Sequence, residues 1–233
     1  MSMREYLKEA LTTQNITLSE EQYAQFEQLY EALKETSQHT NLTTILDEAG
    51  VAEKHFADSL LPISLKLIKG DEKIIDVGSG AGFPGLPLKI VYPDLDLTLL
   101  EATGKKCAFI ENTAERLGLN ILLKNGRAEE IAHAEIARMC YDICVSRAVA
   151  RLNMLLELCA GFVKPGGRIL AYKGEKAEEE IKEAESAARK LGLCFVGLYE
   201  DKQGKTKIAV YERKEKLKDI YPRKFSNIKN KAL

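Results

Sequence analysis

The sequence lacks several features that would place it in a specialised protein class. Its five cysteines include no Cys-x-x-Cys pair and its three histidines show no His-x-x-x-His spacing, so common zinc-ligand patterns are missing. No apolar run approaches the roughly 18 residues of a membrane span, and the start of the chain has no signal-peptide hydrophobic stretch. We therefore expect a cytoplasmic protein without a metal or a membrane partner, whose cysteines are reduced thiols in the core.

The composition that is present favours a well-packed globular protein. The chain has 233 residues, of which 45% are apolar and 30% charged, and a chain of this length buries roughly 70% of its unfolded surface. The net charge is −1, but residues 1–70 hold six basic and eleven acidic side chains, whereas residues 205–233 hold ten basic and three acidic ones. The basic end indicates either a solvated tail or a contact for a polyanion, and charge alone does not separate the two.

The first 70 residues are expected to form a helical segment. Apolar residues recur at intervals of three and four from Leu18 to Leu33, which is typical of an amphipathic helix. Ser19, with Gln22 three residues later, forms a capping-box pattern that predicts the start of this helix. A second helix is expected over about residues 47–67, where His55 and Asp58 are three residues apart and therefore on one face.

Residues 71–214 are expected to form a Rossmann-like α/β domain. Apolar runs typical of parallel strands buried on both faces alternate with helical stretches, at residues 73–77, 96–101, 121–124, 141–146 and 168–173. A charged helix over 175–191 precedes two further strands, 193–200 and 205–213, whose short connection predicts an antiparallel hairpin. A parallel sheet that ends in such a hairpin resembles the class I methyltransferase fold, which dehydrogenases do not share. Residues 215–233 follow as a basic C-terminal tail.

A glycine-rich turn follows the first predicted strand. Its spacing is G-x-G-x-G, with Phe83 where the dinucleotide fingerprint requires Gly or Ala. The turn is therefore poorly suited to binding the pyrophosphate of a nicotinamide dinucleotide. Glu101 ends the second strand, nineteen residues after Gly82, where a carboxylate can accept hydrogen bonds from both ribose hydroxyls of a nucleoside. A structural turn and a surface glutamate are the alternatives, but the two features together predict a nucleoside-containing cofactor.

Two further loops follow the third and fourth strands, at the sheet edge where open parallel sheets bind ligands. Residues 125–130 are expected to face the adenine and residues 146–150 the reacting atom. The second loop contains neither an Asn/Asp-Pro-Pro-aromatic tetrad, which would hold an exocyclic amine, nor a Pro-Cys nucleophile, so those two chemistries lose support. Cys144 lies within the preceding strand and is expected in the core.

Seven stretches of the chain match motifs of one known family. They are NLT (41–43), KHFADSL (54–60), the glycine segment (76–87), GRAE (126–129), SRAVA (146–150), KG (173–174) and YPRK (221–224). With them, the sequence resembles the RsmG family over essentially its whole length. This family is also called glucose-inhibited division protein B (GidB) and comprises bacterial 16S rRNA guanine-N7 methyltransferases. Glycine turns occur in many methyltransferases, but KHFADSL, SRAVA and YPRK together do not.

The resemblance implies methyl transfer from S-adenosylmethionine to N7 of a guanine in the decoding-region loop of 16S rRNA, with the rRNA or the small ribosomal subunit as partner. The cofactor-binding residues that it implies are Gly78, Gly80, Gly82, Phe83, Glu101, Ala102, Thr103, Ala128, Glu129 and Arg147. Arg147 is also the candidate catalytic residue. The candidate substrate-binding residues are His55, Lys173, Arg223 and Lys224.

The implied chemistry agrees with a loop that offers no obvious base. N7 of neutral guanine has an in-plane lone pair and no proton to lose, so attack on a sulfonium methyl needs positioning and exclusion of water. Three other functions stay open: a small-molecule methyltransferase with the N-terminal helices as a lid, an NAD-dependent dehydrogenase, and a ribosome-binding module that has lost catalysis. Saturable binding of S-adenosylmethionine would exclude the last of these.

Overall fold

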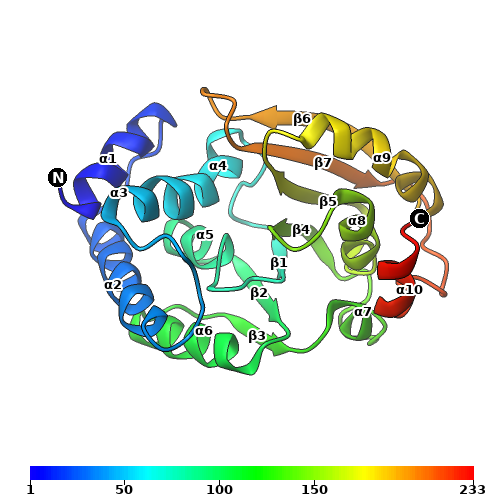
Figure 1. The fold of residues 1–233 in the computed structure, drawn as a ribbon, viewed down its shortest axis with the longest axis horizontal. Helices are drawn as coiled ribbons and strands as arrows, with labels where there is room; N and C mark the ends of the chain where they lie inside the picture. Colours follow the sequence, from blue (N-terminus) through cyan, green and yellow to red (C-terminus); the bar gives the residue numbers. More distant parts are fainter. The chain divides into compact units, whose positions relative to one another are not determined.

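The computed structural model describes residues 1–233 and has a mixed α/β fold (Figure 1). The strand order is β3-β2-β1-β4-β5-β7-β6. The chain divides into two compact units, the first made of Met1–Asp71 with Ser79–Asn125 and the second of Glu72–Gly78 with Gly126–Leu233. One of the points at which the chain passes between the units lies inside the glycine turn, after Gly78.

The first unit is mainly helical. It contains α1 (Met3–Thr13), α2 (Glu20–Ser37), α3 (Glu48–Gly50), η1 (Val51–Ala57), α4 (Asp58–Ser64), α5 (Gly85–Val91), β2 (Asp96–Glu101), α6 (Gly104–Arg116) and β3 (Leu122–Asn125). The parallel pair β2 and β3 packs against α6, and α2 contacts both α5 and α6. The predicted strand 96–101 has these bounds, whereas the strand predicted at 121–124 begins and ends one residue later.

The predicted amphipathic helix is confirmed as α2. The Ser19 hydroxyl accepts a hydrogen bond from the Gln22 amide at 3.2 Å, and the Gln22 side chain accepts one from the Ser19 amide at 2.9 Å, which completes the capping box. The apolar stripe from Leu18 to Leu33 is buried. The helix expected over 47–67 is present as α3, η1 and α4, and its central π-helical turn includes a bond from the Asp58 amide to the Glu53 carbonyl.

Helix α1 was not predicted, although the signals for it are local. Met3, Leu7 and Leu11 are buried at intervals of four residues, and Ser2 and Glu5 form a second capping box. This helix packs on η1 and α2 within the first unit. Within the helical segment expected over residues 1–70, the first helix therefore begins sixteen residues before the predicted cap at Ser19, since α1 starts at Met3.

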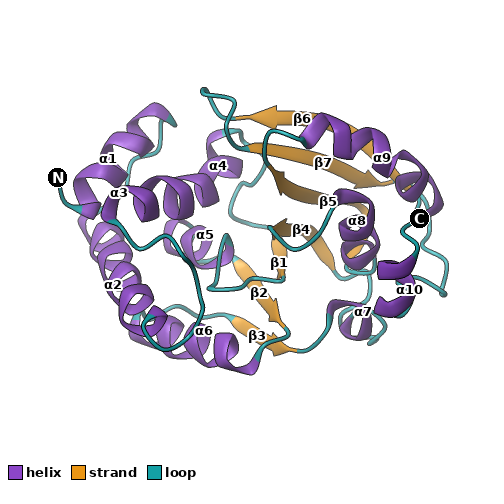
Figure 2. Ribbon diagram, viewed as in Figure 1, coloured by secondary structure: helices purple, strands orange, loops and turns teal.

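The second unit carries the rest of the sheet. It contains β1 (Lys73–Val77), α7 (Ala128–Ile131), β4 (Tyr141–Arg147), α8 (Leu152–Ala160), β5 (Val163–Lys173), α9 (Ala177–Lys190), β6 (Leu193–Glu200), β7 (Lys207–Arg213) and α10 (Phe225–Asn230). Strands β1, β4 and β5 are parallel, and β7 is antiparallel to both β5 and β6, as the predicted hairpin requires. Helix α9 packs on α8 and on β6 and β7 (Figure 2). Helix α10 lies within the tail and was not predicted.

The cysteines correct one expectation. Cys107, Cys144 and Cys159 are buried, as predicted, but Cys140 is partly exposed and Cys194 is exposed, so the prediction of five core thiols is wrong for two of them. Cys194 lies on β6, which is the last strand in the sheet order, and Cys140 precedes β4. Burial raises the pKa of the Cys144 thiol well above its ordinary value. No helix combines the length and the apolar character that crossing a membrane requires.

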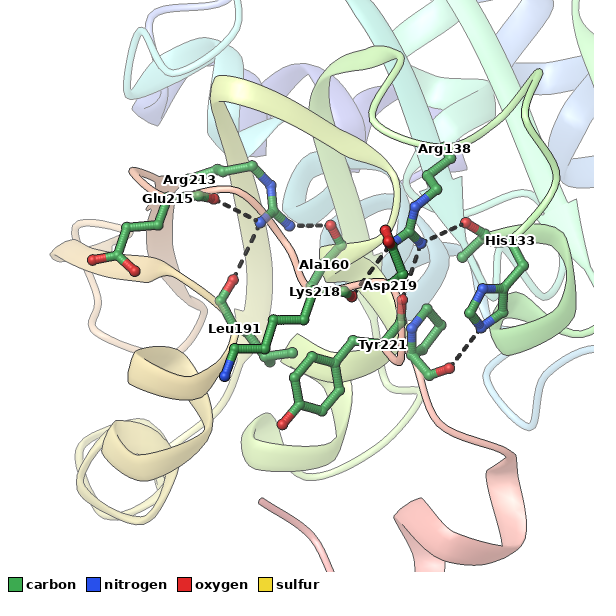
Figure 3. A network of polar contacts seen from close by, with 11 residues as sticks. His133, Arg138, Ala160, Leu191, Arg213, Glu215, Lys218, Asp219 and Tyr221 are labelled. Carbon is green, nitrogen blue, oxygen red and sulfur yellow. Dashed lines mark hydrogen bonds and ion pairs between the residues drawn. The ribbon is translucent and has the colours of Figure 1, made fainter.

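Arg213 is a fully buried cation at the end of β7. Its guanidinium donates to the carbonyls of Ala160, Leu191 (3.2 Å) and Glu215 (3.3 Å) (Figure 3), and its Nε donates to the Val163 carbonyl at 2.9 Å. Burial, together with the nearby charge of Arg138, lowers its pKa to about 10. The side chain thus supplies hydrogen-bond donors to three buried carbonyls and to the part-buried carbonyl of Glu215.

Replacing Arg213 with Met should destabilise the protein by about 3 kcal/mol or more, because several buried carbonyls lose their donor at roughly 1 kcal/mol each. Lys214→Met is the matched control, since Lys214 is exposed and pairs with Glu212 at the surface. The control should change the free energy of unfolding by less than about 0.5 kcal/mol. Urea unfolding followed by circular dichroism measures both, and equal stability of the two variants would contradict a structural role for Arg213.

Candidate active site

The glycine turn after β1 has a backbone that few side chains permit. Gly78, Gly80 and Gly82 have φ angles of 72°, 60° and 83°. The carbonyl of Ser79 accepts hydrogen bonds from the amides of Gly82 at 2.8 Å and Phe83 at 2.9 Å, which closes the turn before α5 begins. A Cβ atom on Gly82 would overlap the Leu86 side chain. The spacing of the glycines is therefore required by the turn itself.

Glu101 is hydrogen-bonded to this turn, a contact that was not predicted from the sequence. Its carboxylate accepts hydrogen bonds from the Gly80 amide at 2.9 Å and from the Thr103 amide at 2.8 Å. The residue is only 7% exposed. Because each carboxylate oxygen has a second lone pair, both can accept a further hydrogen bond from a ligand hydroxyl. The structure thus brings Gly80, Glu101 and Thr103 together, with the exposed Ala102 between the last two.

Sequence reasoning missed Ser79. Its side chain is 2% exposed, and its hydroxyl oxygen has no hydrogen-bond partner. Buried hydroxyls are normally hydrogen-bonded, so this one fits a site that a polar ligand completes. A serine between two glycines of the turn was the available signal. The buried hydroxyl and the open acceptor sites of Glu101 together fit a nucleoside-containing cofactor.

His55 and Phe83 connect the helical segment to the turn. Their rings stack with centroids 5.0 Å apart and planes 14° apart, and Phe56 lies 6.0 Å from Phe83 in a tilted arrangement. The Nε2 atom of His55 is 2.8 Å from the Thr43 hydroxyl. The KHFADSL motif therefore packs against the buried Phe83, and the NLT motif contacts His55 of that motif.

In the second unit, Gly78 faces the SRAVA loop. A Cβ atom on Gly78 would overlap the Val149 side chain, which is itself 39% exposed. Ala148 has a φ of 58°, an uncommon conformation for a residue other than glycine. The hydroxyl of Ser146 donates to the Val77 carbonyl at 2.8 Å and so ties the end of β4 to the end of β1. Arg147, the last residue of β4, thus lies beside the start of the glycine turn.

Lys173 supports the same loop from within. Its side chain is 7% exposed, and its ammonium donates to the Ala150 carbonyl and to the Glu180 carboxylate, both at 2.8 Å. Glu180 also accepts from the Leu152 amide at 2.8 Å. Burial alone would raise the pKa of Glu180, but these hydrogen bonds and the nearby charges of Lys173 and Arg151 outweigh it and lower the pKa. Lys173, predicted to contact substrate, is engaged inside the protein.

The GRAE loop (126–129) runs into α7, whose first two residues are Ala128 and Glu129. Glu129 is buried and Ala128 partly buried, and the Arg127 side chain reaches Glu129 with Nε 3.3 Å from the carboxylate. The Arg127 guanidinium also lies 4.5 Å from the ring centroid of Phe225, the first residue of α10. The C-terminal tail therefore packs against a loop that the sequence assigned to the cofactor.

The two predicted RNA-binding residues of the tail differ in their surroundings. Arg223 forms a bidentate ion pair with the fully buried Glu157, with its Nε and a terminal nitrogen 2.8 Å and 2.6 Å from the two carboxylate oxygens. The backbone amide of Arg223 donates to the same carboxylate at 2.9 Å. Lys224 is exposed. No group of three or more His, Cys, Asp or Glu side chains that could hold a metal ion occurs in the structure.

The strand order, the glycine turn after β1 and the acidic residue at the end of β2 define a class I S-adenosylmethionine-dependent methyltransferase. A methyltransferase from Pyrococcus furiosus shares this fold, with a TM-score of 0.54 at 15% identity over 81% of this chain and 98% of that one. So does M. jannaschii TYW2 in complex with AdoMet, with a TM-score of 0.55 at 16% identity over 72% of this chain and 77% of that one. At these identities the similarity shows the fold alone.

The sequence comparisons are more specific. Residues 22–207 match the model of the GidB family, rRNA small subunit methyltransferase G. The ribosomal RNA small subunit methyltransferase G of Streptococcus pneumoniae serotype 19F (strain G54) is 40% identical over 222 residues, which cover 92% of each chain. The chain therefore belongs to the GidB family of rRNA small subunit methyltransferases, and the predicted resemblance is confirmed.

Replacing Glu180 with Gln should destabilise the protein in a pH-dependent way. The ordinary pKa of this carboxyl is 4.5 and the folded pKa is lower, so Glu180 is largely ionised in the folded chain at and above pH 4.5. Near neutral pH the wild type should therefore exceed Glu180→Gln in free energy of unfolding by the full amount. Because the folded pKa is lower, this advantage should shrink as the pH falls below 4.5 and vanish below the folded pKa. Urea titrations between about pH 3 and 7 measure it.

The exposed Glu175 supplies the control. Glu175→Gln should change the free energy of unfolding by less than about 0.5 kcal/mol at neutral pH. A Glu180→Gln deficit that stays constant through the whole acid range would show that the ion pair with Lys173 is not its cause.

Proposed function

We propose that the protein transfers the methyl group of S-adenosylmethionine to N7 of a guanine in the decoding-region loop of 16S rRNA, in the cytoplasm. The substrate is the rRNA or the small ribosomal subunit. The family match over residues 22–207 carries this proposal, because it joins a methyltransferase fold to small-subunit rRNA. The glycine turn bonded to Glu101 supplies the matching cofactor site.

The cofactor is proposed to lie along the glycine turn. Glu101 would accept hydrogen bonds from the ribose hydroxyls through its second lone pairs, and the buried Ser79 hydroxyl would gain a polar partner. The further proposed contacts are Gly78, Gly80, Gly82, Phe83, Ala102, Thr103, Ala128, Glu129 and Arg147. The cofactor supplies a methyl group on a positively charged sulfur.

The reaction asks for positioning rather than proton transfer. The N7 lone pair forms the new bond to carbon while the carbon–sulfur bond breaks and its electron pair stays on sulfur. No proton leaves N7, so no general base is required, in agreement with a SRAVA loop that holds none. Arg147, at the end of β4, is proposed to hold the methionine carboxylate or a substrate phosphate, either of which its planar guanidinium suits.

Three parts of the chain are proposed to divide the work. Residues 71–214 bind the cofactor, residues 1–70 border the substrate through His55, and residues 215–233 meet RNA. Lys224 is exposed and available for a phosphate. Arg223 and Lys173 are already engaged with Glu157 and Glu180, so Arg223 supports the tail and Lys173 supports the SRAVA loop from inside. A small-molecule methyltransferase and a dehydrogenase are not favoured by any contact in the structure.

The enzyme should methylate a single guanine when it is incubated with labelled S-adenosylmethionine and small subunits, or their rRNA, from cells that lack it. A methyl group on N7 makes the purine ring open to borohydride reduction, after which aniline cleaves the strand at that position. Cleavage at the labelled nucleotide would identify both the base and the atom. Label on protein, on a different base, or at a guanine that resists this cleavage would contradict the proposal.

Glu101→Gln supplies the matched variant for this assay. It should weaken S-adenosylmethionine binding by about ten- to a hundredfold, because charge-assisted hydrogen bonds contribute about 1.5–3 kcal/mol. Glu111→Gln, on the exposed side of α6, should bind as the wild type does. Equal affinity of both variants in calorimetry would remove Glu101 from the cofactor site.

The double variant Lys224→Gln/Lys229→Gln should bind RNA more weakly and with less salt dependence, because both side chains are exposed in the tail. Each lost phosphate contact flattens the plot of log affinity against log salt by about 0.7 for single-stranded RNA, which gives roughly 1.4 for two. Lys182→Gln/Lys190→Gln, exposed on α9, is the control. An unchanged slope in the tail variant would place the RNA contacts elsewhere.

A further inference from the structure

The Arg127 side chain joins two parts of the proposed machinery. Its Nε atom is 3.3 Å from the carboxylate of Glu129, and the face of its guanidinium lies 4.5 Å from the ring centroid of Phe225. Glu129 belongs to the loop proposed to bind the cofactor, and Phe225 begins α10 in the tail proposed to meet RNA. One exposed arginine thus bridges a buried carboxylate and a C-terminal aromatic ring.

The position of Phe225 is fixed by contacts on both sides of it. Before it, Arg223 forms two side-chain hydrogen bonds with the buried Glu157. After it, Ile228 is fully buried and anchors α10. The ring is therefore carried by an attached segment and not by a loose terminus, which makes it a defined surface for Arg127.

Further contacts hold the chain that leads into this segment. Arg138 donates to the carbonyls of Tyr221 at 3.0 Å and Lys218 at 3.3 Å, and His133 lies 2.7 Å from the Pro222 carbonyl (Figure 3). These donors follow α7 in the chain, so the region that carries the GRAE loop also holds the tail. Several hydrogen bonds thus fasten the tail to the segment that follows α7.

The contact between Arg127 and Glu129 needs this support. The Arg127 side chain is 48% exposed, and its one hydrogen bond to Glu129 is long. A side chain this exposed would often leave Glu129 for conformations solvated by water, because an exposed ion pair is only slightly more stable than its two solvated ions. An aromatic face under the guanidinium restricts it and favours its charge.

We propose that Phe225 is a positioning residue for cofactor binding: it holds Arg127 against Glu129 and so fixes the carboxylate of Glu129 for the cofactor. This inference rests on the proposed cofactor contact of Glu129. Phe225 lies beyond residues 22–207, the part of the chain that matches the family model. The basic tail then acts on both ligands, through its lysines on RNA and through Phe225 on the cofactor.

Calorimetry of the full-length protein with S-adenosylmethionine, in the absence of RNA, tests the proposal. Phe225→Ala should weaken cofactor binding by about three- to tenfold, whereas Phe225→Tyr, which keeps the ring, should stay within about twofold of the wild type. Phe225→Leu keeps apolar volume without an aromatic face and should behave as Phe225→Ala does. A role in packing alone would instead let Phe225→Leu bind normally.

A double-mutant cycle gives the second readout. If Phe225 acts through Arg127, then Arg127→Gln/Phe225→Ala should bind the cofactor no more weakly than Arg127→Gln alone. Additive losses would overturn the proposal, and so would an unchanged cofactor affinity for Phe225→Ala. A Phe225→Ala variant that loses only RNA affinity would make Phe225 an RNA contact, which also overturns it.

Glu129→Gln separates failure of this inference from failure of the proposed cofactor site. If Glu129→Gln weakens cofactor binding and Phe225→Ala does not, only the coupling through Arg127 is wrong. If Glu129→Gln binds the cofactor normally, Glu129 has no part in the site and the proposed role of Phe225 falls with it. Thermal unfolding of each variant establishes that the measured protein is folded.

Discussion

The carboxylate of Glu101 is the constraint on which the cofactor side of the structure depends. The carboxylate accepts hydrogen bonds from the amides of Gly80 and Thr103. The backbone carbonyl of Glu101 accepts one from the Asn125 side chain at 3.0 Å. A carboxylate that is nearly buried is costly unless it is hydrogen-bonded, so the glycine turn, the end of β2 and the start of α6 hold one another in place. The acceptor sites that remain are therefore oriented before a ligand arrives, which lowers the entropy lost on binding.

Cations engaged with partners inside the protein play the corresponding part in the second unit. Arg213 donates hydrogen bonds to backbone carbonyls, and Arg223 forms an ion pair with Glu157. Lys173 forms an ion pair with Glu180 and donates to the SRAVA loop. Lys173 and Arg223 thereby stabilise segments that the proposed function uses, the SRAVA loop and the tail. The resemblance to the RsmG family implied substrate contacts for Lys173 and Arg223, but only the three-dimensional structure shows the carboxylates that engage them.

The sequence was sufficient where the signals are local or periodic. Near-continuous apolar runs predicted the strands, and Ser19 with Gln22 predicted the cap of α2. Helix α1 shows the same kind of signal and was overlooked, whereas the neighbours of Glu157 and the stacking of Phe225 on Arg127 depend on residues far apart in the chain. The missing hydrogen-bond partner of the buried Ser79 hydroxyl likewise depends on how the turn packs. Such tertiary contacts have no signature in a single sequence.

The same internal contacts limit the charge that the basic C-terminal end, residues 205–233, can offer to RNA. Of the ten basic residues from 205 onward, Lys207, Arg213, Lys214 and Arg223 have partners within the protein, which leaves six exposed lysines. Six contacts would give a salt slope of at most roughly four on single-stranded RNA. N7 lies on the major-groove edge of guanine, and that groove is too deep and narrow for side chains in an RNA helix. The proposed target must therefore be an unpaired or splayed guanine, as in a loop, and its backbone offers the single-stranded phosphates for which a small cluster of lysines suffices.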